Sequence, residues 1–157
     1  MRVTVLIACL AVFVGCNSSP KVAEEAAPAA TTDPRTPVSL PADGQQAVLQ
    51  EMRQMLGAMG GALTGAARED TAAVLAALAP AGSAAAADPA LEALVPGEWK
   101  ELAERTHGGF DTLASAVRYA HTPSALKDTV LTGLARITGS CMACHETFRI
   151  MISQSRK

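Results

Sequence analysis

A set of mostly apolar residues near the C-terminus recurs at helical spacing and limits the folds that this chain can adopt. Its members are Leu126, Val130, Leu134, Ile137, Cys141, Cys144, His145, Phe148 and Ile152. Residues at this spacing share one face of an α-helix. Thr122 and Pro123 precede the set as a capping residue and a proline suited to the first helical position. The pattern therefore predicts a long final helix with two cysteines and a histidine on its apolar face.

Three earlier segments carry the same helical spacing, at residues 42–63, 70–78 and about 98–119. Pro41 and Asp70 suit the starts of the first and second segments, and Pro80 suits the end of the second. The alternation of apolar and polar residues that is typical of a half-buried strand is not found. Four amphipathic helices with mostly short connections predict an all-α protein, an antiparallel four-helix bundle.

Four glycines lie within or just beyond the first of these helices, at Gly57, Gly60, Gly61 and Gly65. Glycine destabilises a helix interior by about 1 kcal/mol relative to alanine. Two interpretations follow. Either the helix frays before Gly65, or a flat and bulky group packs against this face and requires the space.

The N-terminal residues predict export. Arg2 is followed by an apolar run from Val3 to Gly15, which is shorter than the roughly 20 residues that a membrane-spanning helix needs. The closing residues Phe13-Val14-Gly15-Cys16 resemble the signal of bacterial lipoproteins. This resemblance implies that Cys16 is acylated and becomes the first mature residue. An ordinary cleaved signal, with Cys16 lost or left as a stray thiol, is the alternative.

The rest of the chain divides into a tether and a domain. Residues 17–40 are rich in Ser, Pro, Ala, Glu and Thr without apolar periodicity. We therefore expect a signal peptide at 1–15, a flexible tether at 16–40 and a folded domain at 41–157, held on the periplasmic side of a membrane. The net charge of −2 comes with no basic cluster, which argues against a nucleic-acid partner. No enzyme signature is visible.

Two of the four cysteines remain for the folded domain, because Cys9 and Cys16 belong to the signal. Cys141-Met142-Ala143-Cys144-His145 is the C-x-x-C-H pattern at which haem is attached in c-type cytochromes. Two thiols at this spacing can form thioethers to the porphyrin vinyl groups, and the adjacent histidine can ligate the iron. We therefore expect one covalent haem c on Cys141 and Cys144, with His145 as the proximal ligand.

Two other uses of the cysteine pair stay open. A zinc site could use both thiolates and His145, but it needs a fourth ligand, for which the sequence offers only His107 and His121. A redox dithiol would need a strand–helix context that the helical pattern does not provide. A zinc or dithiol scaffold without haem is therefore one alternative function.

A haem motif within the last helix of a four-helix bundle resembles cytochrome c′ and its low-spin relatives. The run from Cys141 to Arg149 is similar to the end of that family, which has an aromatic residue three and a basic residue four positions after the histidine. The resemblance covers roughly residues 42–153. It implies that Phe148 lies against the haem, that Arg149 tunes ligand affinity and that two copies form a homodimer. Plain core packing of Phe148 and a solvated charge at Arg149 are the alternatives.

In that family the first helix covers the distal face of the iron. A methionine there gives a six-coordinate electron carrier, whereas a leucine or similar residue leaves an open site for nitric oxide or carbon monoxide. The resemblance places Met52 at this position, with Met55 and Met59 on the same helical face as alternatives and core packing as the competing role. His107 and His121 are further candidates. The leading hypothesis is a membrane-tethered one-electron carrier that serves redox partner proteins, and the alternative is a five-coordinate, gas-binding haem protein.

Overall fold

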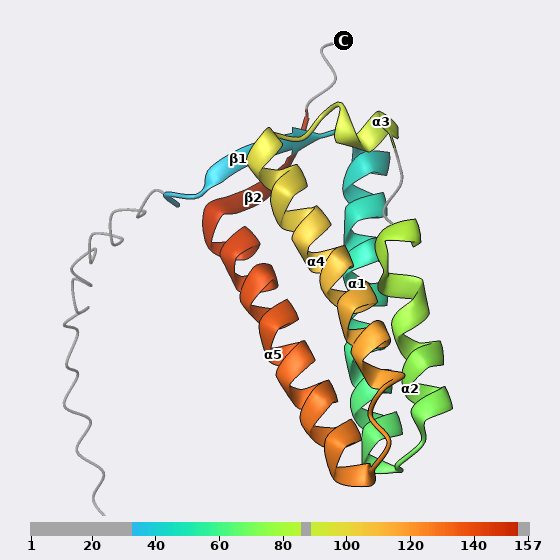
Figure 1. Ribbon diagram of the computed structural model, residues 1–157. Coiled ribbons are helices and arrows are strands. Elements are labelled where there is room, and N and C mark those ends of the chain that lie inside the picture. Colours follow the sequence, from blue (N-terminus) through green and yellow to red (C-terminus); the bar gives the residue numbers. More distant parts are fainter. Residues whose placement is uncertain (1–32, 86–88, 154–157) are drawn as a thin grey trace, which may run out of the picture. The chain divides into compact units, whose positions relative to one another are not determined.

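The computed structural model describes residues 33–85 and 89–153. The described chain is mostly helical, as predicted, and it also contains two short strands (Figure 1). The predicted signal, Cys16 and most of the predicted tether lie outside the described residues. Within the described ranges, every helix is too short or too polar to span a lipid bilayer.

The elements in chain order are β1 (Thr36–Leu40), α1 (Ala42–Ala67), α2 (Thr71–Leu78), the 3₁₀ turns η1 (Ala79–Ala81) and η2 (Ser83–Ala85), α3 (Pro89–Glu92), α4 (Gly97–Val117), α5 (Pro123–Thr147) and β2 (Phe148–Ile152). The long helices begin close to the predicted positions. The side chain of Asp70 accepts a hydrogen bond of 2.9 Å from the Ala73 N–H and caps α2. Thr122 caps α5 in the same way, at 3.2 Å from the Ala125 N–H. Each cap satisfies an N–H that has no partner within its helix.

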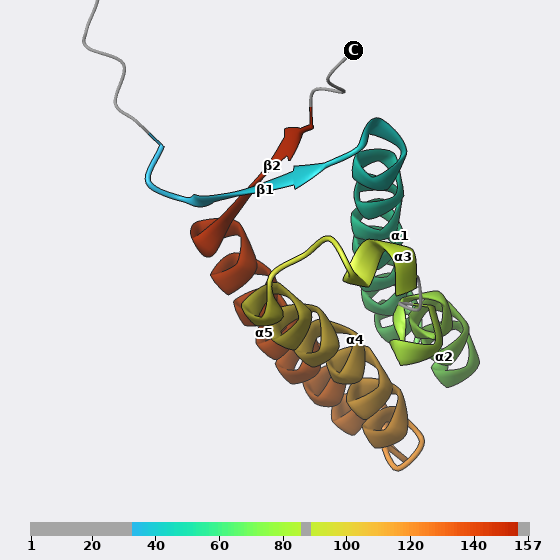
Figure 2. The ribbon, with the colours of Figure 1, turned by 90° about the horizontal axis from the view of Figure 1, so that it is seen from above.

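The long helices pack their apolar faces into a shared core. Helix α1 contacts α2 and α5, and α4 contacts α2 and α5. Figures 1 and 2 show α1 with α2 and α4 with α5 as two pairs. The largest fully buried side chains between them are Phe110, Leu78, Val74, Val117 and Val130. Apolar surface buried in this way contributes about 25 cal/mol per Å² to folding.

Close packing of α1 on α2 accounts for two of the four glycines. A Cβ atom on Gly61 would lie 2.7 Å from the Cβ of Ala77. A Cβ atom on Gly65 would lie 2.9 Å from the backbone nitrogen of Val74. Helix α1 continues to Ala67, so the interpretation that it frays before Gly65 is wrong. At these two positions a neighbouring helix, and not a bound group, requires the space.

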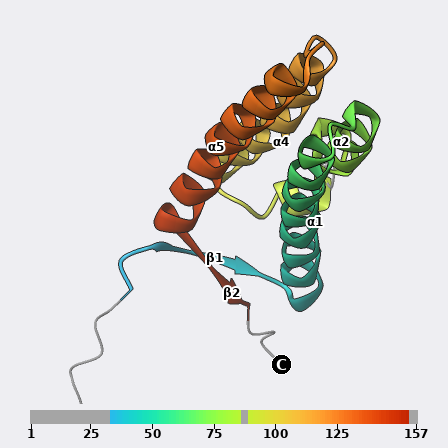
Figure 3. The ribbon, with the colours of Figure 1, turned by 90° about the horizontal axis from the view of Figure 1, so that it is seen from below.

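The two strands correct two sequence-based predictions. Residues 36–40, which the sequence assigns to the tether, form β1 and pair in parallel with β2, from Thr36 opposite Phe148 to Leu40 opposite Ile152. Helix α5 ends at Thr147, so Phe148 and Ile152 lie in a strand and not in the final helix. Figure 3 shows the strand pair spanning from the end of α5 to the start of α1.

A second, smaller core lies under this strand pair. Val38 and Leu40 of β1 are 2% and 0% exposed, and they share one cluster of buried side chains with four residues of the helices and β2. These four are Val48, Trp99, Leu102 and Phe148. The strands therefore cover the end of the helices at which the C-x-x-C-H motif lies.

Candidate functional site

A cavity of about 460 Å³ lies between the first halves of α1 and α4 and the end of α5. Its lining residues are Val48, Leu49, Glu51, Met52, Arg53, Met55, Leu56 and Met59 of α1, Trp99, Leu102, Ala103, Thr106 and His107 of α4, and Thr138, Cys141, Cys144 and His145 of α5. The lining is mainly apolar. The volume falls within the roughly 300–1,000 Å³ that is typical of small-molecule and cofactor pockets.

The wall formed by α5 carries the complete C-x-x-C-H motif. Cys141 and Cys144 are half-buried free thiols, and the side chain of His145 is exposed at the last turn of the helix. Burial raises the pKa of both thiols, and the neighbouring Cys141 raises the pKa of Cys144 further. All three residues face one cavity, because positions three and four apart lie on one side of a helix.

The wall formed by α1 carries the three methionines. Met52 and Cys144 both pack against the buried cluster that contains Trp99. Met55 and Met59 pack with Cys141 against the main core. The structure therefore brings all three predicted thioethers to the cavity that the cysteines line, although each of them also has a packing role.

His107 has partners for both ring nitrogens. It is 3% exposed, with Nδ1 2.8 Å from the carbonyl oxygen of Ala81 and Nε2 3.2 Å from Oε1 of Glu51. A carbonyl and an ionised carboxylate both accept hydrogen bonds, so this arrangement requires both nitrogens to donate. The hydrogen bond with Glu51 raises the pKa of His107, and burial opposes this shift. The ring is engaged in the fold, so this geometry does not favour His107 as an iron ligand.

His121 is exposed in the turn between α4 and α5 and does not line the cavity. Within the described part of the chain, no group of three or more His, Cys, Asp or Glu side chains is placed to hold a bare metal ion.

The two further residues implied by the family resemblance lie outside the cavity lining. Phe148 is buried against Trp99, with ring centroids 5.5 Å apart and ring planes at 54°. Arg149 is half-buried on β2, where Nε donates to the carbonyl of Arg35 at 3.2 Å. Phe148 therefore supports a residue of the cavity wall, and Arg149 holds the segment that leads into β1.

Two features of the site carry no signal in the sequence. The Glu51–His107 pair joins residues of two helices that have no motif in common. Arg53 is the one arginine or lysine among the residues that line the cavity, and its Nη2 donates to Oε1 of Gln50 at 3.1 Å. The folded structure shows both features: the Glu51–His107 pair joins α1 to α4, and Arg53 is held by a residue of its own helix at the cavity lining.

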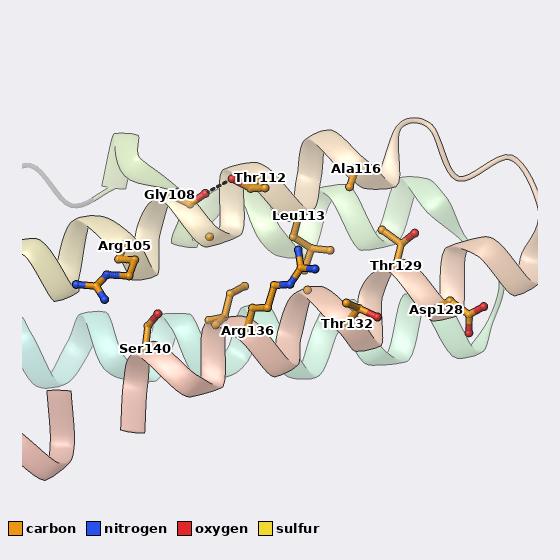
Figure 4. A pocket seen from close by; sticks show the side chains of 13 residues that line it. Arg105, Gly108, Thr112, Leu113, Ala116, Asp128, Thr129, Thr132, Arg136 and Ser140 are labelled. Atoms are coloured by element: carbon orange, nitrogen blue, oxygen red, sulfur yellow. Dashed lines mark hydrogen bonds between the residues drawn. The ribbon is translucent and has the colours of Figure 1, made fainter. Parts of the chain in front are cut away.

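A second hollow, of about 870 Å³, lies between α4 and α5 (Figure 4). Its walls combine glycines and hydroxyl side chains with Leu113 and Ile137, and Thr112 donates a hydrogen bond of 2.8 Å to the carbonyl of Gly108 within α4. Arg105 and Arg136 also line it. None of the residues with predicted chemistry lies there, so the candidate site is the smaller cavity.

No protein-family model, curated protein or solved structure matches this chain. The chemistry of the cavity must therefore be argued from its own residues. Two half-buried thiols beside a histidine, with thioethers on the facing helix and an apolar wall, are the kinds of donors that a covalently attached haem would need. Arg53 adds a cation at the lining, suited to a carboxylate of such a group. The residues present fit this cofactor.

Proposed function

We propose that this chain is an exported c-type cytochrome that carries single electrons at a membrane surface. The observation that carries the proposal is the shared lining of one cavity by the cysteine–histidine motif of α5 and the methionine face of α1. The proposed architecture is an antiparallel four-helix bundle with one haem c near the end of the last helix. When bound, the haem supplies reversible one-electron chemistry at its iron.

The residues of α5 hold the group in this proposal. Cys141 and Cys144 attach it covalently, which prevents its loss from an exported protein. His145 serves as the proximal ligand. The turn that carries His145 is held from outside the helix, because the guanidinium of Arg35 donates to the His145 carbonyl at 3.2 Å.

The residues of α1 and α4 complete the pocket. Met52 is the favoured distal ligand, because it packs in the same cluster as Cys144, and Met55 and Met59 are the alternatives. Trp99 and Leu102 close the apolar wall and limit the access of water. A thioether ligand and an apolar surrounding both favour the reduced iron, which suits an electron carrier.

The location and the partners form part of the same proposal. Lipid on Cys16 would hold the domain on the periplasmic side of a membrane through the segment before β1. Redox proteins are the expected partners. A homodimer remains a proposal that rests on the family resemblance alone.

Absorption spectra of the purified, exported protein test the proposal, in the ferric form, the ferrous form and the ferrous form with carbon monoxide. We expect a low-spin haem spectrum that carbon monoxide leaves unchanged. Met52→Ala should convert it to a high-spin, gas-binding form, and Met55→Ala and Met59→Ala are the matched comparisons. If all three variants keep the wild-type spectrum and potential, the hypothesis that a methionine ligates the iron is wrong.

The same spectra separate the alternatives. A high-spin wild-type protein that binds carbon monoxide would identify a gas-binding protein. If the protein is made in the presence of the haem-attachment machinery and still carries zinc, or no metal, the chain is a zinc or dithiol scaffold and the proposal is overturned.

A further inference from the structure

The ring of His107 joins three elements of the fold at the wall of the cavity. It belongs to α4, its Nδ1 is bonded to the Ala81 carbonyl of η1, and its Nε2 is bonded to Glu51 of α1. Among the described residues, the contact with Glu51 is the only side-chain hydrogen bond or ion pair that links α1 to α4. One buried side chain thus ties α1, α4 and η1 together.

This tie lies where apolar packing leaves a gap. The cavity lies between the middle of α1 and the residues of α4 and α5 that line it, and Leu56 on this part of α1 is 70% exposed. Helix positions are normally fixed by interdigitating side chains. At the cavity, Val48 of α1 packs with Trp99 and Leu102 of α4, and the Glu51–His107 hydrogen bond adds a directional link between the same two helices.

We infer that His107 is a positioning residue for methionine ligation, because it holds through Glu51 the turn of α1 that presents Met52 to the cavity. This inference rests on the proposed function. Glu51 directly precedes Met52 in α1, so a shift of the Glu51 carboxylate moves the backbone that carries the thioether. Methionine is flexible and three of them line the cavity, so the position of α1 decides which one reaches the iron.

Variants of Glu51 test the inference better than variants of His107, because the Glu51 side chain is 28% exposed, whereas replacing the buried His107 ring would leave a cavity in the fold. Glu51→Ala removes the link to α1. We expect it to weaken the methionine-to-iron absorption band of the ferric protein, to lower the midpoint potential and to allow carbon monoxide to bind the ferrous form. Glu51→Gln replaces the carboxylate by an amide whose oxygen can still accept the hydrogen bond from Nε2, so it should keep the wild-type spectrum.

Gln54→Ala is the matched control, since Gln54 is an exposed polar residue on the same helix, outside the cavity lining. It should leave spectrum and potential unchanged. A purely structural role would lower the thermal unfolding temperature of Glu51→Ala without changing the spectrum or the potential, and this result would overturn the inference alone. A wild-type protein without haem, or without the methionine band, would instead overturn the proposed function and this inference with it.

Discussion

The guanidinium of Arg35 donates a hydrogen bond of 3.2 Å to the backbone carbonyl of His145, 110 residues later in the chain. In return, Nε of Arg149 donates to the backbone carbonyl of Arg35 at 3.2 Å. The last carbonyls of a helix have no partner within it and favour nearby cations. Arg35 supplies both at the end of α5: a hydrogen bond to an unpaired carbonyl and a nearby cation. The segment before β1 therefore holds the turn that carries the proposed proximal ligand.

Truncation of Leu40 should show that β1 belongs to the folded domain. Leu40 is 0% exposed, and we expect Leu40→Ala to lower the free energy of unfolding by about 2–5 kcal/mol. Ser39→Ala is the matched control, because Ser39 is exposed on the same strand and should change the free energy by less than about 0.5 kcal/mol. Urea denaturation followed by circular dichroism gives both values. Equal and small effects would show that residues 36–40 are a tether after all.

The difference between predicted helices and missed strands has a physical origin. The caps Asp70 and Thr122 act on N–H groups three residues away, so a local pattern identifies them. Strand β1 contains a proline and only two buried residues, and its partner strand, which begins at Phe148, lies far along the chain from Thr36. The run Phe148–Ile152 continues the helical spacing, because a short apolar run fits a helix and a strand equally well.

The candidate site shows the same division. Cys141, Cys144 and His145 are recognisable because their chemistry is contained in five consecutive residues. The methionines are recognisable as a set because they share one helical face. The pairing of Glu51 with His107 was not predictable, since two isolated polar residues on separate helices become partners only when the chain folds.

Substitutions of the glycines in α1 should have opposite effects at two positions. A Cβ atom on Gly60 would have no heavy atom within 4 Å, so Gly60→Ala should stabilise the protein by about 0.5–1 kcal/mol through helix propensity. A Cβ atom on Gly65 would lie 2.8 Å from Cγ2 of Val74, so Gly65→Ala should destabilise it by about 1–3 kcal/mol through overpacking. Thermal unfolding measures both. Stabilisation by Gly65→Ala would mean that α1 and α2 are not packed as described.

The stability of the fold should depend on the protonation of His107. The pKa of this group is raised above its ordinary value of 6.5 in the folded protein, first by the hydrogen bond with Glu51. A raised pKa means that folding favours the protonated ring. Its contribution is therefore fully present below pH 6.5, and it is lost as the pH rises through the folded pKa.

Urea midpoints of wild type and His107→Gln, measured across this range, check the prediction. The difference between their urea midpoints should be largest at acidic pH and shrink as the pH rises above 6.5, the ordinary pKa of histidine. Glu51→Gln removes the carboxylate that raises the pKa of His107, so the urea midpoint of this variant should vary less with pH than that of the wild type. A gap that stays constant with pH would show that protonation of His107 does not contribute to folding.

The thiols of Cys141 and Cys144 should react slowly when no haem is attached. Burial raises the pKa of both above the ordinary value of 9.0, so the reactive thiolate is scarcer at neutral pH than in an exposed cysteine. In folded protein made without haem-attachment machinery, we expect maleimide labelling to be slow at neutral pH and to accelerate as the pH approaches the raised values. The same chain unfolded in urea is the control and should label rapidly.

Mass spectrometry of the exported protein provides the other half of this test. If both thiols form thioethers, the denatured chain should take up no label at Cys141 or Cys144 and should retain the mass of one haem. Replacing either cysteine by serine should leave the remaining thiol able to attach the group through a single bond, because Cys141 and Cys144 line the cavity independently from successive helical turns. Full labelling of both thiols in the mature wild-type protein would exclude covalent haem and favour a dithiol or zinc role for this pair.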